Sequence, residues 1–389
     1  MTGDTGRIAI VGAGIAGLTL ATLLRRAGIE CDLYEQTSRL SAVGAGIQLP
    51  PNGVRLLGML GARDALARHG VVAEHIASRR WSDGRLLAQV PHGDLCTQMY
   101  AAPYVLMHRA DLQAALLDLL PGDAGLGRRV AAVTEYPGHV ELRLAGGRTT
   151  RAALVIGADG VHSVVRPAVV RDEPRHSGYS VYRGLVPADQ LRAVAADAGV
   201  TFWFGPGRHV TYYPVAGRRT VHFSAVAATP AAPGDPAAEL RALFAGWHPA
   251  VRRVVTAAET VTRWTLSDRD LARRYTTQRI ALVGDAAHPT LPYLSQGAGQ
   301  ALEDAVTLAR LLTAGLPPAV ALRRYERLRR SRTAEIHRQA RAKAVTYHLP
   351  DGPAQRRRDA YLHRHQTLEH LRWIYAGGPS HAGAVPVVA

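Results

Sequence analysis

A glycine-rich segment near the start of the chain has the residue types and spacing that bind a dinucleotide. Residues 12–17 read GAGIAG and lie between an apolar strand-like run and an apolar helical pattern. Gly12 permits a tight turn, Gly14 lets a pyrophosphate approach the backbone, and Gly17 lets the helix pack against the strand. Glu35 ends the next strand-like run, where an acid accepts hydrogen bonds from a ribose diol. The pattern predicts a βαβ unit and does not separate FAD from NAD.

Two later strand-like runs also end in an aspartate beside a glycine. The run 154–156 leads into a GADG turn that contains Asp159, and the run 279–283 leads into Gly-Asp at Asp285. An aspartate at a strand tip can bind a hydroxyl group of a sugar chain, and the glycine-rich helix start at 297–299 attracts negative charge. An ordinary turn is the alternative for Asp159. Because that turn repeats the architecture of the first motif, the sequence favours a second nucleotide contact.

A third feature is a cluster of aromatic and imidazole side chains on a predicted antiparallel sheet. Helical periodicity disappears between 177 and 227, where strand-like runs alternate with turn sequences. In the run 209–215, alternation predicts His209 and Tyr213 on one face and Tyr212 on the other. A histidine or tyrosine that faces a bound ligand can exchange a proton with it or form a hydrogen bond to it. The alternative is that the tyrosines only pack within the sheet.

The composition favours a globular protein that binds small molecules. A chain of 389 residues with 47% hydrophobic content can form two domains or one large domain with an excursion. The net charge of +16 comes from scattered arginines, because Lys343 is the only lysine. We therefore expect a field that attracts an anionic substrate or reductant, and no nucleic-acid partner. Cys31 and Cys96 cannot form a disulfide framework, and no cluster has the spacing of metal ligands.

No part of the sequence is typical of a membrane anchor. No apolar run reaches the ~20 residues that span a bilayer. The apolar stretch 8–24 contains the glycine motif and leads directly into a second strand, unlike a signal peptide. We therefore expect a soluble cytoplasmic protein with reduced thiols.

The three motifs, in this order and spacing, resemble the single-component FAD-dependent aromatic monooxygenases, the p-hydroxybenzoate hydroxylase-like family. The branch that contains salicylate hydroxylase and 6-hydroxynicotinate 3-monooxygenase is the most similar, and the resemblance extends from about residue 7 to residue 341. It implies an α/β fold: a Rossmann-like FAD-binding βαβ domain, an inserted antiparallel β-sheet substrate domain and a helical C-terminal part. The expected segments are 1–175 and 271–345 for FAD binding, 176–270 for the substrate sheet, and 346–389 for the C-terminal extension and tail.

The resemblance also implies which residues bind FAD. The glycine motif would hold the pyrophosphate, Glu35 the ribose, and the Gly/Pro-rich loop 39–51 would pass the middle of the dinucleotide. Asp285 would bind the ribityl or pyrophosphate region. The helix start near 297 would offer N–H groups to the N1–C2=O edge of the flavin. The full implied set is Gly12, Gly14, Ala16, Gly17, Glu35, Gly46, Arg109, Asp159, Asp285, Pro292, Gly297 and Ala298.

The implied reaction is hydroxylation of an activated aromatic or heteroaromatic ring with NADH or NADPH and O₂, through a C4a-hydroperoxyflavin. The substrate would be a small phenol, salicylate, hydroxypyridine or natural-product intermediate, and the site must exclude water. By resemblance Tyr212 is the favoured substrate-facing residue, ahead of Tyr213 and His209. Gln48 falls where a hydroxynicotinate hydroxylase carries histidine, which argues against a hydroxypyridine. The catalytic candidates are Tyr212, Tyr213, His209, Gln48 and Pro292.

Weaker candidates and other functions stay open from the sequence. Arg183 could pair with a carboxylate, Tyr182 and His222 are weaker substrate contacts, and His288 is expected to be structural. The same fold could also support an epoxidase, a urate-type hydroxylase, a prenyl reductase, or a flavin-binding regulatory protein without turnover. The sequence is compatible with a monomer or a homodimer.

Overall fold

The computed structural model describes residues 6–39, 45–232 and 234–377. Its centre is a four-stranded parallel sheet in the order β17-β11-β1-β2. These strands are short apolar runs, as expected for strands that are covered on both faces. Both β1 and β11 are buried along their whole length. Segments from three distant parts of the sequence thus meet in one sheet. The strands are β1 (Ile8–Val11), β2 (Cys31–Tyr34), β11 (Leu154–Gly157) and β17 (Ile280–Leu282).

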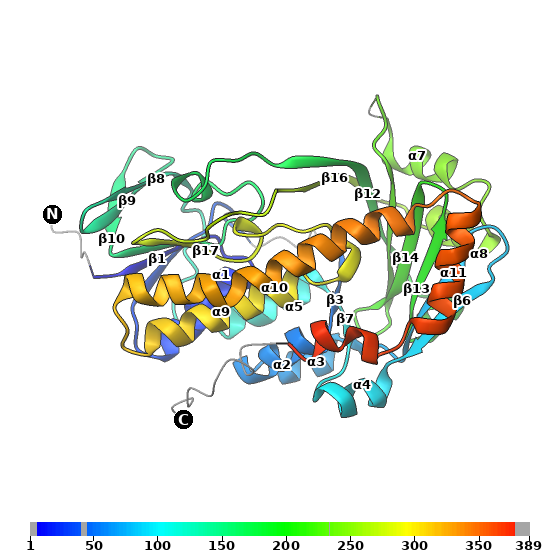
Figure 1. The fold of residues 1–389 in the computed structure, drawn as a ribbon, viewed down its shortest axis with the longest axis horizontal. Helices are drawn as coiled ribbons and strands as arrows, with labels where there is room; N and C mark the ends of the chain where they lie inside the picture. Colours follow the sequence, from blue (N-terminus) through cyan, green and yellow to red (C-terminus); the bar gives the residue numbers. More distant parts are fainter. Residues whose placement is uncertain (1–5, 40–44, 233, 378–389) are drawn as a thin grey trace.

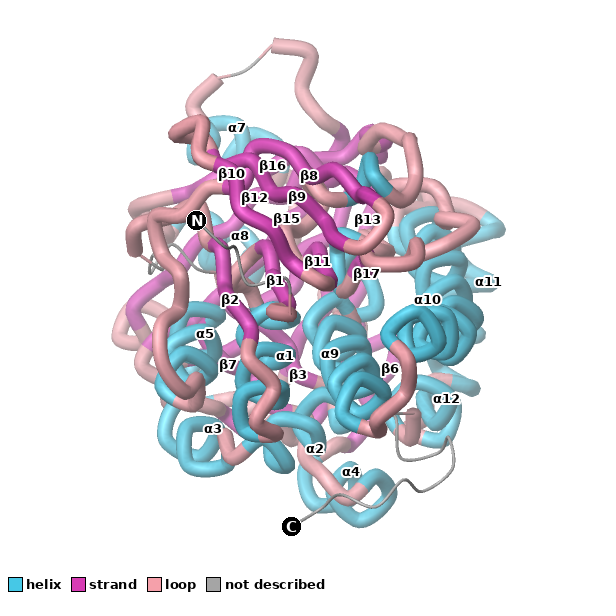
Figure 2. The backbone as a smooth tube through the Cα atoms, turned by 90° about the vertical axis from the view of Figure 1, so that its left-hand side faces the viewer, coloured by secondary structure: helices cyan, strands magenta, loops and turns pink. Residues whose placement is uncertain are grey.

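Helices cover one face of this sheet and a smaller sheet covers the other (Figures 1 and 2). On the helical side, α1 and α9 lie side by side, and α10 packs on α9. The three-stranded antiparallel sheet β10-β9-β8 lies on the opposite side. The elements of these layers are α1 (Ile15–Arg26), α5 (Arg109–Asp118), α9 (Gly297–Thr313), α10 (Pro318–Tyr347), β8 (Val130–Tyr136), β9 (His139–Leu144) and β10 (Thr149–Ala152).

A seven-stranded sheet, in the order β16-β12-β15-β14-β13-β5-β6, forms the other half of the molecule (Figure 1). Its strands are antiparallel except where β5 runs parallel to β13. An apolar cluster under α7 and α8 packs against one face of the sheet. The elements are β5 (His75–Arg80), β6 (Leu86–Pro91), β12 (Arg175–Pro187), β13 (Val200–Gly205), β14 (Arg208–Val215), β15 (Thr220–Ala228), β16 (Val261–Asp268), α6 (Arg192–Ala196), α7 (Pro236–Leu243) and α8 (Pro249–Thr256).

The hairpin β5–β6 corrects one predicted boundary. The sequence assigns strand-like runs at 76–81 and 86–90 to the first FAD-binding segment, 1–175. In the structure they extend the seven-stranded sheet, because β5 pairs with β13 from Ile76↔Val200 to Arg80↔Phe204. The sheet is therefore not confined to 176–270. Such a parallel pairing between distant segments leaves no local pattern in the sequence.

The loop predicted at 39–51 is also partly corrected. Residues 40–44 lie outside the described residues, but Gly46–Leu49 forms a strand, β3, that pairs with β7 (Val105–His108). Hydrogen bonds to β7 allow this glycine-rich segment to be extended. The third strand of this small sheet is β4 (Val71–Val72), and the helices beside it are α2 (Pro51–Leu60), α3 (Arg63–His69) and α4 (Gly93–Tyr100).

The C-terminal part is helical, and α10 connects the two halves of the molecule (Figure 1). This helix of 30 residues begins beside the four-stranded sheet and ends beside the seven-stranded one, and α11 follows it next to β6. Among the described residues, no helix is long and apolar enough to cross a membrane. The remaining elements are α11 (Pro353–His365), α12 (Arg372–Tyr375) and the short 3₁₀ turns η1 (Arg166–Ala168), η2 (Gly284–Ala286), η3 (Pro292–Leu294) and η4 (Glu369–Leu371).

Candidate functional site

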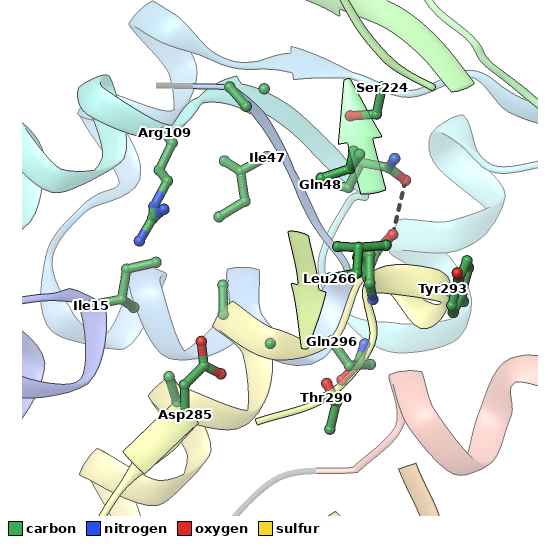
Figure 3. Close-up of a pocket in the computed structure, with 18 of the residues that line it drawn as sticks. Ile15, Ile47, Gln48, Arg109, Ser224, Leu266, Asp285, Thr290, Tyr293 and Gln296 are labelled. Atoms are coloured by element: carbon green, nitrogen blue, oxygen red, sulfur yellow. Dashed lines mark hydrogen bonds between the residues drawn. The ribbon is translucent and has the colours of Figure 1, made fainter. Parts of the chain in front are cut away.

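A cavity of about 420 Å³ lies where the two main sheets meet (Figure 3). It is bounded by the start of α1, the loop between β17 and α9, strand β3, and one face of the seven-stranded sheet. Small-molecule sites typically measure about 300–1,000 Å³. Most of the predicted site residues line it, from widely separated parts of the sequence. The lining candidates are Gly14, Ala16, Gly46, Gln48, Arg109, His209, Tyr213, Asp285, Pro292, Gly297 and Ala298.

The three motif glycines have different physical roles. Gly12 has φ +102°, and a Cβ there would lie 2.4 Å from the carbonyl oxygen of Ala158. A Cβ on Gly17 would lie 1.9 Å from the carbonyl oxygen of Gly12, so close packing of the turn excludes any side chain. A Cβ on Gly14 would meet no atom within 4 Å. Because Gly14 lines the cavity, its missing side chain leaves room for a ligand and not for the protein.

Two helix N-termini are exposed at this cavity without a capping side chain. Gly14 is the N-cap of α1 and Gln296 that of α9, and neither makes a side-chain capping hydrogen bond. Neither helix has an acidic residue in its first turn. Gly297 and Ala298, at the start of α9, line the cavity. Free N–H groups and the helix dipole at two converging ends suit an anionic ligand such as a dinucleotide with an electron-rich ring.

Asp285 and Arg109 place opposite charges at the same end of the cavity (Figure 3). Asp285 follows β17 and is open toward the cavity although protein surrounds it. This burial raises the pKa of the Asp285 carboxyl, while His288 and Arg109 oppose the shift. A carboxylate with free acceptor positions at a strand tip can accept hydrogen bonds from ligand hydroxyl groups.

Glu35 and Asp159 lie outside the lining of the cavity, as do Gly12 and Gly17. Glu35 accepts hydrogen bonds from the backbone N–H of Ala13 at 2.9 Å and from Thr37. It thus braces the glycine turn, and its predicted contact with a ribose stays a prediction. Asp159 accepts a hydrogen bond from the Val164 N–H at 2.7 Å, which fixes its own turn.

The structure corrects the preference for Tyr212. His209, Thr211 and Tyr213 line the cavity, whereas Tyr212 points to the opposite face of β14. There its hydroxyl accepts a hydrogen bond from Trp203 Nε1 at 3.1 Å inside the apolar cluster. The strand alternation predicted this division. The position carried over by resemblance was one residue away from it, and such a shift exchanges the faces of a strand.

Three polar residues that the sequence reasoning missed or ranked low surround the substrate side of the cavity. Tyr104 donates a hydrogen bond to Gln48 Oε1 at 2.7 Å. Ser295 donates to the same oxygen at 3.2 Å, and Figure 3 marks this bond at Gln48 with a dashed line. Arg183 lines the cavity, and its buried Nε has no hydrogen-bond partner in the described part of the chain. Burial lowers the pKa of Arg183, although the nearby Tyr213 opposes this. The positive φ of Ser295, +53°, marks an unusual turn that no pattern in the sequence revealed.

The other weak candidates do not line the cavity. Tyr182 donates to Glu239 at 2.9 Å on the far face of the sheet. His222 lies behind Tyr213, with Nε2 2.9 Å from Ser224 Oγ, and burial lowers its pKa to about 3. No group of the described residues could hold a metal ion.

A buried network of charged groups connects the first half of α9 to the neighbouring elements. Arg329 of α10 donates to Glu303 and to Asp304, each at 2.6 Å. Asp304 also accepts from the Gly284 N–H at 2.8 Å and pairs with His288 at 2.5 Å. Asn52 donates to Glu303 at 2.8 Å. The network ties η2, α2, α9 and α10 together, and the expectation that His288 is structural agrees with its position.

Comparisons with known proteins agree with this geometry. A model of the FAD binding domain family matches residues 5–340. The chain is 56% identical to the 3-amino-4-hydroxybenzoate 2-monooxygenase of Streptomyces cremeus, with 98% of each chain covered. It is 37% identical to the 6-hydroxynicotinate 3-monooxygenase of Bordetella bronchiseptica, over 85% of this chain and 90% of the relative. The structure of Klebsiella pneumoniae HpxO complexed with FAD and uric acid has a TM-score of 0.87 at 30% identity and covers 97% of this chain and 99% of that chain.

These findings confirm the resemblance that the three motifs indicate. They also confirm the predictions of FAD as cofactor and of aromatic-ring hydroxylation as the reaction. The uncapped ends of α1 and α9 and the open position beside Gly14 fit the phosphates and flavin of that cofactor, and the lining side chains of Asp285 and Arg109 fit its hydroxyl groups and phosphates. The chain belongs to the FAD binding domain family and is an FAD-dependent aromatic-ring monooxygenase.

Proposed function

We propose that this enzyme hydroxylates a small aromatic acid, with 3-amino-4-hydroxybenzoate as the first candidate and C2 as the position attacked. NADH or NADPH is the reductant in this proposal. Three observations support it. The chain is 56% identical to a 3-amino-4-hydroxybenzoate 2-monooxygenase along nearly its whole length. Gln48 replaces the histidine of a hydroxynicotinate hydroxylase, and the positive charge of Arg183 lines the cavity. The uncompensated cation Arg183 is the observation that carries the argument for an acid.

Arg183 needs an anion that the described residues do not supply. It lies on β12 beside the cavity, its Nε is buried without a partner, and no carboxylate within the described ranges forms an ion pair with it. A buried unpaired charge is costly, and proteins normally pair it or use it. A benzoate carboxylate matches the planar donor fork of a guanidinium. We therefore assign Arg183 as the receptor of the substrate carboxylate.

The remaining lining residues give the reaction its environment. Bound FAD, once reduced, supplies the activation of O₂. The N–H groups at the start of α9 would stabilise negative charge on the flavin ring. Burial raises the pKa of Tyr213, so its hydroxyl stays protonated and donates to an oxygen of the substrate. His209, on the same face of β14, can accept a proton from a phenol.

The arrangement of the chain follows from these roles. We infer that the four-stranded sheet with α1 and α9 holds FAD and that the seven-stranded sheet, including β5 and β6, carries the substrate side. In this proposal Glu35 contacts the adenosine ribose of FAD, and the turn that contains Asp159 contacts FAD and the nicotinamide reductant. The enzyme acts in the cytoplasm as a monomer or homodimer in this proposal.

Oxygen consumption and NADH or NADPH oxidation by the FAD-bound enzyme test the proposal directly. We expect 3-amino-4-hydroxybenzoate to accelerate both, with one hydroxylated product formed per reductant consumed. 2-Aminophenol, which lacks only the carboxylate, is expected to be a poor substrate because it leaves Arg183 unpaired. Failure of this acid to stimulate oxidation, with stimulation by another phenol, would overturn the proposed substrate and leave the monooxygenase assignment intact.

Replacement of Arg183 is expected to weaken the binding of the aromatic acid and to leave the binding of a phenol without a carboxylate almost unchanged. Arg183→Gln removes a charge-assisted hydrogen bond worth about 1.5–3 kcal/mol, so KM for 3-amino-4-hydroxybenzoate is expected to rise roughly 10- to 150-fold. KM for 2-aminophenol is expected to change little. Arg175→Gln is the matched control, because Arg175 lies on the same strand but is exposed, 3.4 Å from Asp270. Equal losses for the acid and for 2-aminophenol would contradict the role of Arg183.

A further inference from the structure

Three polar side chains from distant segments form a hydrogen-bonded cluster at the wall of the cavity. Gln48 lies on β3 and lines the cavity. Its Oε1 accepts hydrogen bonds from the hydroxyl of Tyr104 at 2.7 Å and from that of Ser295 at 3.2 Å. A carbonyl oxygen has two lone pairs, so these two donors occupy both of its acceptor positions. The amide nitrogen, which carries two N–H donors, is the part of Gln48 that stays available to a ligand.

The hydroxyl of Tyr104 keeps the Gln48 amide in this orientation. Burial raises the pKa of Tyr104, although a hydrogen bond to Ser295 opposes the shift. The hydroxyl therefore carries its proton at neutral pH and donates it to Gln48 Oε1. With the amide turned around, the Tyr104 proton would lose this acceptor, and a buried donor without its partner is costly.

Packing from the C-terminal segment fixes the ring of Tyr104. Tyr104 is buried, and its ring meets those of His92 and Tyr375 edge-on, with centroids 5.2 Å and 6.0 Å away. Tyr375 lies on α12, and Arg55 of α2 donates a hydrogen bond to its carbonyl oxygen at 2.8 Å. The last described turn of the chain thus keeps the Tyr104 hydroxyl directed at Gln48.

The amide nitrogen of Gln48 belongs to a group of donors on the substrate side of the cavity. In Figure 3 this nitrogen points away from the dashed bond at the Gln48 oxygen. Burial raises the pKa of Tyr213, while the nearby Arg183 and a hydrogen bond from Gln48 oppose the shift. All three side chains line the same cavity. A substrate atom that meets this group must accept hydrogen bonds.

We propose that Gln48 is a fixed hydrogen-bond donor that selects an oxygen acceptor on the substrate, and that Tyr104 is the positioning residue that orients its amide. The inference rests on the proposed function only for the choice of an aromatic acid as ligand. A carboxylate or a ring oxygen would satisfy the donors. A ring N–H or an ammonium group would place two donors face to face. Histidine at this position could accept as well as donate, whereas Gln48 with its oxygen occupied cannot.

The test is titration of FAD-bound enzyme with 3-amino-4-hydroxybenzoate, and separately with salicylate, followed through the flavin spectrum. Tyr104→Phe keeps the ring and frees the Gln48 amide to rotate. We expect Kd for the acid to rise about 3- to 10-fold, the range of one neutral hydrogen bond, with unchanged FAD affinity. Tyr100→Phe is the matched control and is expected to bind as wild type. Tyr100 packs on the same Tyr375 ring, but its hydroxyl donates to the carbonyl of Leu368.

A double-mutant cycle shows whether Tyr104 acts through Gln48. Gln48→Met removes the amide at nearly constant side-chain length, and we expect Kd to rise roughly 10-fold. Addition of Tyr104→Phe to Gln48→Met is expected to cause no further rise. Gln48→Glu keeps an oxygen for Tyr104 and Ser295 but replaces the donor by an acceptor. For an anionic ligand we expect this variant to cause the largest rise in Kd, about 100-fold.

Three results would overturn the inference. A full effect of Tyr104→Phe in the Gln48→Met background would show that Tyr104 acts by another route. An equal rise in Kd in Tyr100→Phe would show that only packing around Tyr375 matters. Wild-type binding by Gln48→Glu would show that the ligand presents no acceptor to this position. If 3-amino-4-hydroxybenzoate leaves the flavin spectrum unchanged while salicylate perturbs it, the proposed substrate fails and salicylate still measures the cycle.

Discussion

Gly17→Ala is expected to give a colourless protein that no longer takes up FAD. The new Cβ would lie 1.9 Å from the carbonyl oxygen of Gly12, a backbone atom that cannot rotate away. The turn between β1 and α1 must therefore open, at a cost of about 1–3 kcal/mol or more for such overpacking. Because this turn places the start of α1 at the cavity, FAD affinity is expected to fall at least about a hundredfold, which corresponds to 2.7 kcal/mol. Flavin fluorescence and thermal unfolding measure the two effects.

Gly14→Ala provides the matched comparison, since it adds the same methyl group three residues earlier. Its φ of −78° is ordinary for alanine, and the Cβ would meet no protein atom within 4 Å. The stability of the FAD-free protein is expected to stay within about 0.5 kcal/mol of wild type. FAD affinity is nevertheless expected to fall if the cofactor occupies this open space, as its position at the cavity predicts. Wild-type affinity in Gly14→Ala would show that the pyrophosphate lies elsewhere, and a stable yellow Gly17→Ala would disprove the packing argument.

Arg329→Met is expected to destabilise the enzyme by about 3–5 kcal/mol at pH 7, because it removes the cation that two buried carboxylates share. Arg332 remains beside Glu303 and His288 beside Asp304. Glu303 and Asp304 are both almost inaccessible to solvent. Arg330→Met is the control one position away, since Arg330 is exposed and its nearest carboxylate, on Glu326, is 3.8 Å away. That surface pair is worth at most about 1 kcal/mol. Denaturant unfolding of both variants measures the difference, and equal losses would contradict the prediction.

The pH dependence of this effect has a definite sign. Burial alone would raise the pKa of both carboxyls, but Arg329, with His288 and Arg332, lowers them to about 2. Their contribution to wild-type stability is therefore present above the unfolded pKa values of about 4 and is lost as the pH falls toward 2. In Arg329→Met the two acids lose their shared cation and are protonated more readily, so the variant loses less stability on acidification. The gap between the two proteins is expected to narrow from pH 7 to pH 4.

The parts of the fold that the sequence predicted are those with a local signature. Three patterns predict local geometry from a few consecutive residues. They are the GAGIAG segment between strand and helix, the aspartates at strand ends and the alternating run at 209–215. The structure brings most of the residues from these patterns to one cavity. Alternation along β14 even identified the correct face for Tyr213.

The features that were missed depend on contacts between distant segments. The hairpin β5–β6 joins its sheet only through pairing with β13, and β3 is a strand only because β7 lies beside it. Arg183 looked like any strand arginine, because its lack of a partner is a property of the assembled cavity. His348 follows the end of α10 and belongs to no motif. Its hydrogen-bond partner, His209, is 139 positions away in the sequence.

The long helix α10 links the two ends of this site mechanically. It runs from Pro318 to Tyr347 without an internal proline or glycine. Arg329 is bonded to Asp304 of α9 near one end of the cavity, and Tyr347 packs beside His209 at the other. At 1.5 Å per residue, these two anchors are about 27 Å apart along a single stiff rod. One inserted residue between them would turn the far end by about 100°. Evolution can therefore exchange individual side chains along this rod, but it cannot change the number of residues between the anchors without detaching one end of the active site from the other.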